Sequence, residues 1–531
     1  MRIAPMSDVA RYEYFLFLLL VILALERLAR RLALPPAAAF ILGGTGLALL
    51  PGTPELTLDP DLVMVVFLPP LLMSSAWFTA WHEFRRNLRG ILALAVGTTL
   101  FTTLAVGIAA RLAVPSLPWA VCFTLGAIVS PPDAVAAEAA MERLNLPGRI
   151  TSLLLGESLL NDATGLVLFR FALAAALTGL FDPMAAVGAF CLVSVGGVAI
   201  GVVLGWGGLF LIRRLRDSDL IITATVLLAA ASYIGADRLH VSGVLATVTT
   251  GLMLGWNQHA DFSAGTRVRA QAFWKVMVFL LQSVLFILIG LSLRGVLHRL
   301  EGTADLLHRL VIPIAAILAT MIVSRFVWLF GTDAVRAVLR RWWPRKFATP
   351  SLPETIVMAW SGMRGVVTLA AALSLPEALP GRDLALCCAF AAILVTVLLQ
   401  GITLEPLVRA LKLTDDDAAR IQSDENAAWV RVAEAQLRTI EQASRQPDGT
   451  ERHPRLLEQY RHRLRVTREY AQDMPIHRPE EIAHYQAVLA AIQAARAEIL
   501  ASYHHGQIHD HVLREMEQDL DMQEIAAETR L

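Results

Sequence analysis

Charged residues are scarce in this sequence. Asp, Glu, Lys and Arg make up 17% of its 531 residues, whereas soluble globular proteins carry about 25%. Hydrophobic residues make up 56% of the chain. This composition excludes an ordinary soluble enzyme or binding domain and indicates an integral membrane protein.

Cysteines and cofactor motifs are also few. The four cysteines lie in apolar segments, without the spacing of a zinc site or a disulfide framework. No phosphate-binding glycine loop of the Walker type is present, which argues against ATP-driven pumping. The apolar segments lack the histidine sets of a metal-dependent hydrolase, although a two-aspartate enzyme built from Asp133 and Asp162 stays as an alternative. We expect no enzymatic activity, no cofactor, no resident metal and no nucleic-acid partner.

Long apolar runs dominate the first 412 residues. A transmembrane helix needs about 20 mostly apolar residues, and thirteen stretches meet this criterion. They lie near 13–30, 34–51, 62–81, 90–114, 117–141, 149–179, 184–212, 218–236, 241–256, 273–296, 308–330, 353–376 and 383–408. No small-residue cleavage pattern follows the first stretch, so we expect a membrane helix there and not a signal peptide. The predicted fold is an all-α polytopic membrane protein.

The basic residues between these stretches predict the orientation. The segments that follow odd-numbered spans hold 21 Lys and Arg, and those that follow even-numbered spans hold six. Cytosolic loops carry the excess of Lys and Arg. The N-terminus is therefore predicted outside and the C-terminus in the cytosol.

The charge balance divides the chain into two predicted domains. Residues 413–531 hold 22 acidic and 14 basic residues, which leaves 24 acidic and 32 basic residues in residues 1–412. The first part is a basic transmembrane domain, and the second an acidic cytosolic tail with a helical pattern of three or four segments. The tail contains a cluster of four histidines, His504, His505, His509 and His511. We interpret these histidines as a solvated helix end in preference to a metal site or pH sensor.

The segment from Gly156 to Arg170 carries the strongest functional signal. It lies inside an apolar span and contains Glu157, Ser158, Asn161 and Asp162. A carboxylate at mid-membrane costs at least about 2.5–3.5 kcal/mol on insertion scales. Residues four apart share a helix face, so this polar set cannot face lipid. An ion or proton site is the favoured reading, and a buried salt bridge that only fixes helix packing is the alternative.

Two spans have broken interiors. Pro131 and Pro132 remove consecutive amide donors just before Asp133 in the fifth span, and glycines flank Arg364 in the twelfth. Each is the fifth span of a half, and the two cross the membrane in opposite directions. This pattern predicts an inverted repeat with one interrupted helix per half and a binding site near the midplane.

The charges at these breaks have predicted partners. Asp133 can meet exposed helix N-termini, and Arg364 can meet exposed carbonyl groups. A structural role is favoured for Arg364 because a guanidinium does not exchange protons at physiological pH. Arg325, within the eleventh span, also needs a partner, since buried charges are retained when they are paired. Glu157 is the predicted partner if Asp162 performs the ion chemistry.

Four segments together resemble the bacterial sodium/proton antiporters of the monovalent cation:proton antiporter superfamily. They are L-P-P-L-L from Leu68, S-P-P-D-A-V-A from Ser130, G-E-S-L-L-N-D-A-T from Gly156 and G-M-R-G-V-V-T-L-A from Gly362. The resemblance covers about residues 13–412. It implies a homodimer in a bacterial inner membrane, two crossed interrupted helices and alternating access. It also implies Asp162 as the shared sodium and proton site, assisted by Asn161 and Ser158, with Asp133 at the crossing and Arg325 paired to Glu157.

Two departures from the family pattern bear on the transported cation. Relatives commonly read T-D-P at the first break, where this chain has Pro132, Asp133 and Ala134. Many also carry an acid after L-P-P-L-L, where this chain has Met73, Ser74 and Ser75. The expected function is exchange of H⁺ for Na⁺, with Li⁺ or K⁺ left open, in support of pH and sodium homeostasis. Asn161 replaces a second acid found in some relatives, so we expect one proton per cation and electroneutral exchange. A K⁺-preferring antiporter and a cation channel remain alternatives.

Overall fold

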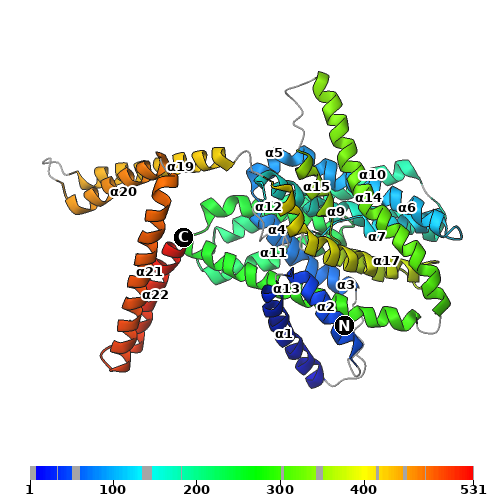
Figure 1. Ribbon diagram of the computed structural model, residues 1–531, viewed down its shortest axis with the longest axis horizontal. Helices are drawn as coiled ribbons and strands as arrows, with labels where there is room; N and C mark the ends of the chain where they lie inside the picture. The colour runs from blue at the N-terminus through cyan, green and yellow to red at the C-terminus, as the bar shows by residue number, and fades with distance from the viewer. Residues whose placement is uncertain are drawn as a thin grey trace. The chain divides into compact units, whose positions relative to one another are not determined.

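The computed structural model describes residues 8–32, 34–50, 60–133, 146–180, 182–300, 304–342, 351–413, 418–445, 451–472 and 474–529. The chain divides into two compact units, Met1–Thr414 and Asp415–Leu531. Apart from one bridge between Arg445 and Glu451, these residues form helices and their connections (Figure 1). The all-helical class predicted from the sequence is therefore confirmed.

Each of the thirteen apolar stretches contains a helix in its described part. The helices of the first unit are α1 (Asp8–Arg31), α2 (Pro36–Leu49), α3 (Pro60–Leu62), η1 (Val63–Phe67), α4 (Leu68–Phe78), α5 (Trp81–Leu92), η2 (Ala93–Thr98), α6 (Thr99–Ala113), α7 (Trp119–Val129), α9 (Gly148–Thr178), α10 (Pro183–Ile212), α11 (Ser218–Arg238), α12 (Gly243–Asp261), α13 (Ala264–Leu300), α14 (Ala304–Trp342), α15 (Leu352–Trp360), α16 (Val366–Leu373), α17 (Arg382–Val395), η3 (Thr396–Gln400) and α18 (Gly401–Leu411). Eight helical runs in the described residues are long and apolar enough to span a membrane. The total of thirteen crossings stays a prediction.

Three of the long runs contain a π-helical segment. The segments η1, η2 and η3 lie inside the continuous runs Pro60–Phe78, Trp81–Ala113 and Arg382–Leu411. In the second of these runs, α5 begins at Trp81 and carries the basic residues expected in a loop after the third span. Phe84, Leu88 and Leu92 recur every four residues, which gives this basic segment an apolar helical face. The expected loop is therefore an amphipathic helix.

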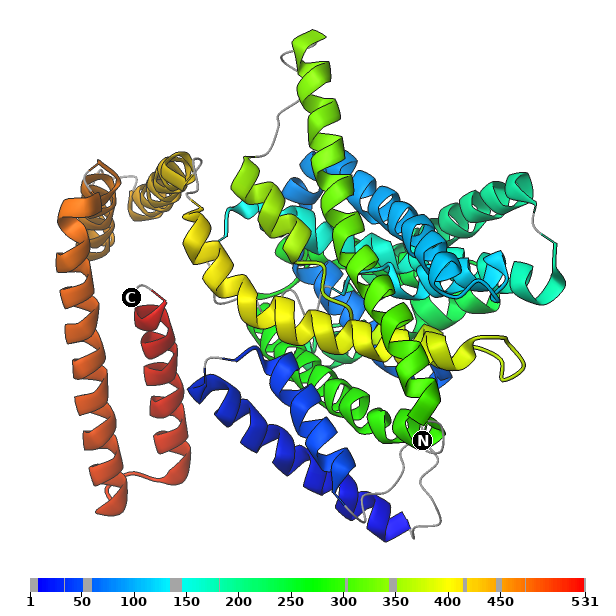
Figure 2. The ribbon, with the colours of Figure 1, turned by 45° about the vertical axis from the view of Figure 1, so that its right-hand side comes forward.

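The first unit is built from packed helix pairs. The pairs include α2 with α13, α10 with α12, α6 with α7, α7 with α9, and α14 with α6. Figure 2 shows α1 beside α2, and the long α14 projecting beyond its neighbours at its C-terminal end. Helix α9 contacts eight of the α-helices in this unit, which are α4, α5, α6, α7, α10, α12, α15 and α16. The polar segment predicted from the sequence therefore lies on a central helix.

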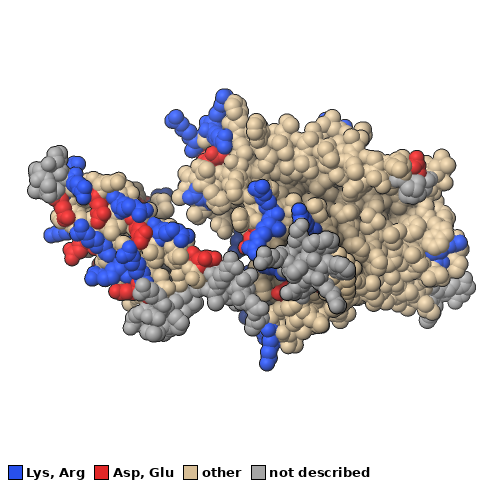
Figure 3. Space-filling view, turned by 90° about the horizontal axis from the view of Figure 1, so that it is seen from above, with Lys and Arg blue, Asp and Glu red and all other residues tan. Residues whose placement is uncertain are grey.

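The second unit consists of two helical hairpins. Helix α19 (Ala418–Ser444) packs on α20 (Pro454–Gln472), and α21 (Met474–His504) packs on α22 (Asp510–Glu528). Each hairpin has an ion pair: Arg468 Nη2 lies 2.8 Å from Glu434 Oε1, and Arg496 Nη2 lies 2.7 Å from Asp521 Oδ1. Charges of both signs are interspersed on this unit, whereas most of the visible surface of the first unit is uncharged (Figure 3).

Candidate functional site

Four polar residues in the middle of α9 face the protein interior. Exposed fractions are 1% for Glu157, 6% for Ser158, 0% for Asn161 and 8% for Asp162. The helix continues for 31 residues through this set. Its backbone donors and acceptors are therefore satisfied within the helix, and only the side chains need partners. The geometry of the site therefore depends on the hydrogen-bonding and charged groups that neighbouring elements place next to these four side chains.

The first predicted break is present at the end of α7. The helix ends at Val129, and residues 130–133 are not helical. Asn161 Nδ2 donates a hydrogen bond of 2.5 Å to the carbonyl oxygen of Pro132. Thr103 Oγ1 donates to Ser130 Oγ over 3.0 Å. The continuation of the predicted fifth span, residues 134–145, lies outside the described residues.

The second predicted break separates α15 from α16. Residues Ser361–Gly365 connect the two helices, and α15 begins with a capping box between Ser351 and Glu354. The amide of Asp133 donates to the carbonyl oxygen of Met363 over 2.7 Å. The two breaks are therefore joined directly through their backbones, as expected for interrupted helices that meet.

Glycines at the second break allow two charged side chains to approach. A Cβ atom on Gly365 would collide with the carboxylate of Asp133, and one on Gly362 would lie 2.7 Å from Arg325 Cδ. Gly365 precedes the first residue of α16, so the Asp133 carboxylate lies beside a helix N-terminus. The positive end of the helix dipole favours a carboxylate at this place.

Glu157 forms a buried bidentate ion pair with Arg325. Arg325 Nη1 lies 2.5 Å from Glu157 Oε1, and Nη2 lies 2.8 Å from Oε2. Arg325 Nε also donates to the carbonyl oxygen of Met358 over 3.1 Å. The two side chains are 3% and 1% exposed. This geometry satisfies the charge of Glu157 and ties α9 to α14 and α15.

Arg364 is buried but has a different environment from the one expected. Its Nε lies 3.4 Å from the sulfur of Met321, and its Nη1 has no hydrogen-bond partner among the described residues. The sequence favours carbonyl groups at the break as its contacts, and the structure instead places a thioether against Nε. The backbone amide of Arg364 donates to Thr396 Oγ1 over 2.9 Å.

Asp162 contrasts with Glu157. Within the described part of the chain, the Asp162 carboxylate has no hydrogen bond or ion pair, and Asp133 is close enough for the two carboxylate charges to interact. The side-chain oxygen of Asn161 is also buried without a partner among those residues. Ser158 lies four residues before Asp162 and shares its helix face. Carboxylate, amide and hydroxyl oxygens are ligands that hard cations prefer.

The hydroxyl groups near the breaks are not identified by the sequence analysis. Thr103 contacts Ser130, Thr396 holds the amide of Arg364, and Ser324 Oγ lies 3.1 Å from Thr102 Oγ1. The available signal is weak, since each is a single hydroxyl in an apolar span. No group of three or more His, Cys, Asp and Glu side chains suited to a metal occurs in the residues that the structure describes.

The sequence matches one family model over most of its length. The model is described as sodium/hydrogen exchanger, transmembrane, and it matches residues 15–410. The low-affinity Na⁺/H⁺ antiporter NhaS1 of Synechocystis is 30% identical, covering 82% of this chain and 81% of that protein. A sodium, potassium, lithium and rubidium/H⁺ antiporter of Bacillus pumilus is 31% identical, covering 80% of this chain and 64% of that protein.

A solved structure has the same fold. The sodium proton antiporter MjNhaP1 of Methanocaldococcus jannaschii superposes with a TM-score of 0.61 at 20% sequence identity. The superposition covers 76% of this chain and 99% of that chain. Over this share of the chain, the helical arrangement is therefore that of an antiporter of known structure.

Proposed function

Because the chain belongs to the sodium/hydrogen exchanger family, we propose that it exchanges protons for sodium ions across the membrane, with Asp162 as the shared site. One observation carries the assignment to Asp162. Its buried carboxylate has no hydrogen bond or ion pair among the described residues, whereas Arg325 neutralises Glu157 on the same helix. A buried carboxylate needs a compensating proton or cation.

Exchange follows because a proton and a sodium ion compete for the same carboxylate oxygens of Asp162. A proton on Asp162 removes its charge, and a sodium ion bound there compensates the charge. Ser158 and the free side-chain oxygen of Asn161 add neutral oxygen ligands to the site. Asp133 stays charged beside the N-terminus of α16 and orients the break. The site is then neutral with either ion bound, which permits it to cross between the two sides.

The surrounding assembly follows the family pattern. Residues 1–412 form the exchange domain of a homodimer in the bacterial inner membrane, with the N-terminus outside and the C-terminus in the cytosol. Residues 413–531 form a regulatory cytosolic tail. The two interrupted helices place the ion site near the midplane, and rigid-body movement of the helices around this site exposes it to one side of the membrane at a time. The physiological role is pH and sodium homeostasis.

The assignment is tested by cation flux in proteoliposomes with an imposed pH gradient. Wild-type protein should take up Na⁺ only while the gradient is present, and Asp162→Asn should abolish uptake while leaving a folded, inserted protein. Parallel arms with Li⁺ and K⁺ determine the cation range, which matters because the Bacillus pumilus relative is named for four alkali cations. Na⁺ flux that continues without any proton movement would indicate a channel. Comparable exchange by Asp162→Asn would remove Asp162 from the mechanism.

The proposed stoichiometry is one proton for one cation. Asn161 supplies an amide beside Asp162 and donates to Pro132, so it does not titrate. An imposed membrane potential should therefore change neither the rate nor the end point of exchange, while a pH gradient changes both. Currents on a solid-supported membrane provide the measurement. A steady-state current that reverses with the Na⁺ gradient would contradict electroneutrality and make Asp133 a second proton carrier.

A further inference from the structure

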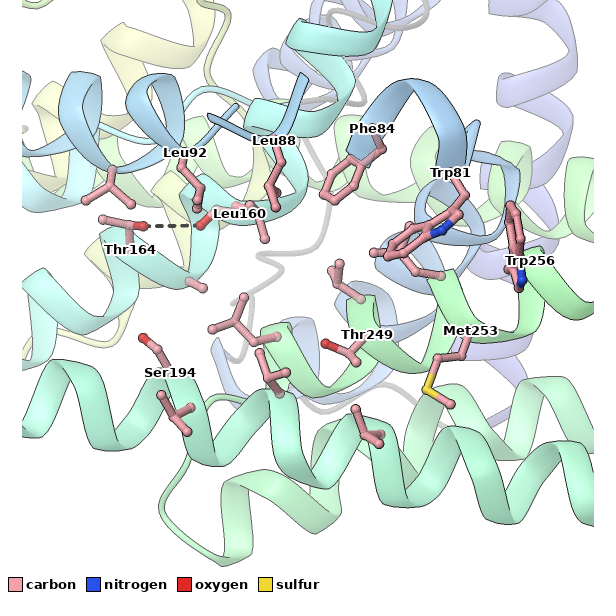
Figure 4. A pocket seen from close by; sticks show the side chains of 18 of the residues that line it. Trp81, Phe84, Leu88, Leu92, Leu160, Thr164, Ser194, Thr249, Met253 and Trp256 are labelled. Atoms are coloured by element: carbon pink, nitrogen blue, oxygen red, sulfur yellow. Dashed lines mark hydrogen bonds between the residues drawn. The ribbon is translucent and has the colours of Figure 1, made fainter. Parts of the chain in front are cut away.

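A large apolar cavity lies beside α9 and is lined by residues other than those of the proposed ion site. It has a volume of about 750 Å³ and lies between α5, α9, α10 and α12. Figure 4 shows Trp81 and Trp256 at one end of the cavity and Thr164 and Ser194 toward the other. From α5, the cavity is lined by Phe84, Leu88 and Leu92, the apolar stripe of that amphipathic helix.

The cavity leaves large apolar side chains uncovered by protein. Leu88 is 37% exposed, Leu92 45%, Val195 70% and Trp256 56%. Contiguous apolar surface of this kind marks a site for an apolar partner. Since α5 continues into a membrane-spanning helical run, hydrocarbon chains of the bilayer are the apolar material present at the cavity.

A second cavity of about 650 Å³ adjoins the first and is more polar. Both are lined by Trp81 and Trp256, whose rings cross edge to face with centroids 6.3 Å apart. The second cavity is also lined by His82, His259 and Arg267. No acidic side chain is among its lining residues in the described part of the chain. An anion would therefore meet donors and no opposing carboxylate.

The apolar cavity, the two tryptophans and the basic cavity follow one another in the same order as the acyl chain, interface and headgroup of a lipid. Tryptophan side chains collect at the boundary between acyl chains and headgroups, and here two of them separate an apolar cavity from a basic one. The basic residues of α5 and of the start of α13 follow the third and ninth spans, on the predicted cytosolic side. The cytosolic leaflet carries the anionic lipids.

We propose that the two cavities together bind one anionic phospholipid, with its phosphate at His82, His259 and Arg267 and an acyl chain in the apolar cavity. Charge complementarity in the basic cavity selects an anionic headgroup, and the apolar cavity selects a lipid over a free phosphate ion. The acyl chain would contact Leu160 and Ala163 of α9. Lipid composition would thus act directly on the helix that carries Asp162.

The acyl-chain part is tested by photocrosslinking of the full-length protein in nanodiscs. The probes are phosphatidylglycerol and phosphatidylcholine with the same diazirine-bearing acyl chain, and crosslinked peptides are mapped by mass spectrometry. Phosphatidylglycerol should label α5 and α12 in the wild type. Ser194→Phe, which places a bulky ring in the cavity, should strongly lower this labelling, whereas Leu192→Phe, at an exposed position of α10 outside the lining, should preserve it. Equal labelling of both variants would overturn the proposal.

The headgroup part is tested by charge removal. Arg267→Gln should lower phosphatidylglycerol labelling about fivefold, the effect of one basic group near an anionic lipid, and leave phosphatidylcholine labelling unchanged. Arg269→Gln, two residues along α13 and outside the lining, is the matched control. Arg267 also donates to the carbonyl of Phe262 over 2.6 Å, so the double variant His82→Gln/His259→Gln provides a second test that spares this bond.

Three results would contradict the proposal. Equal labelling by the two lipids would show that the headgroup is not recognised. Loss of the preference for phosphatidylglycerol on addition of inorganic phosphate, with labelling by phosphatidylcholine unchanged, would assign the basic cavity to a free ion. Labelling that depends on protein concentration and disappears on dimer formation would show that a second copy of the chain covers the cavity.

Discussion

The two units contain ion pairs of similar length in opposite environments. In the first unit, Arg325 and Glu157 approach to 2.5 Å with side chains only 3% and 1% exposed. In the second, Arg496 and Glu524 approach to the same 2.5 Å with side chains 31% and 30% exposed. Water screens the second pair and keeps each partner solvated when the other is removed. The first pair lacks this protection, so the length of an ion pair does not indicate what it contributes to stability.

A second contrast lies within α9. Glu157 and Asp162 are acids five residues apart on one buried helix, and an arginine pairs with only one of them. The paired acid can remain charged in every state of the protein. The unpaired acid has to acquire its compensation from solution, as a proton or a cation. This difference supports the proposal that Glu157 contributes to stability and Asp162 to exchange.

The largest predicted effect comes from removing one member of the buried pair. Glu157→Ala or Arg325→Ala leaves an uncompensated buried charge, which typically costs about 3–5 kcal/mol. We expect a large loss of thermal stability of the detergent-solubilised protein. Asp162→Asn is the matched control on the same helix, because it removes a charge without a partner, and its stability should not fall.

A charge-swapped double variant sharpens this prediction. Glu157→Arg/Arg325→Glu should recover part of the stability lost in the single variants, although the bond from Arg325 to the Met358 carbonyl is lost. A double-mutant cycle between the alanine variants provides the coupling energy. Purely additive losses would show that the contact contributes nothing beyond each side chain alone.

A smaller effect is expected at Asn161. Asn161→Ala removes the donor to the Pro132 carbonyl and leaves a polar group buried without a partner. Such a group costs about 1–3 kcal/mol, so stability should fall by less than in the Glu157 variants. Asn161→Gln keeps the amide but displaces it, and it should recover little. Thermal unfolding in detergent measures both, and unchanged stability of Asn161→Ala would refute a positioning role for the amide.

The sequence predicts the elements of this site better than their contacts. Apolar runs locate the helices, and the Pro131–Pro132 and Gly362–Gly365 patterns locate the breaks, because these signals are local. Glu157 follows as the partner of Arg325 by elimination among few membrane acids, and the two residues touch across 168 positions of sequence.

Other contacts have no local signal. The Asn161 amide meets a carbonyl 29 residues away, and Arg364 lies against the thioether of Met321. Both depend on how four helices pack, which sequence spacing does not encode. The π-helical segments also lack a local signal, since the runs that contain them have ordinary apolar composition. The arginines of α5 are typical of a loop between spans, so the sequence does not predict a helix there.

In the tail, Arg496→Gln should have a smaller effect than either change in the first unit. The guanidinium contacts Asp521 and Glu524, but it remains accessible to water. Hydrogen exchange of α21 and α22 in the full-length protein should show slightly faster opening at low salt. The difference from wild type should vanish at 1 M salt, where the Debye length falls to about 3 Å. A difference that persists at high salt would indicate that the pair acts through packing.

The smallest effect concerns acid titration at the other hairpin. The hydrogen bond from Arg468 holds the pKa of Glu434 below its ordinary value of 4.5. A lowered folded-state pKa means that the unfolded hairpin binds the proton more readily. The stabilisation is therefore complete above pH 4.5 and is lost as the pH falls through the lowered value. Hydrogen exchange of α19 and α20, corrected for the intrinsic pH dependence, should show this loss in the wild type and its absence in Glu434→Gln. The same acid dependence in both proteins would assign the titration to another carboxylate of the tail.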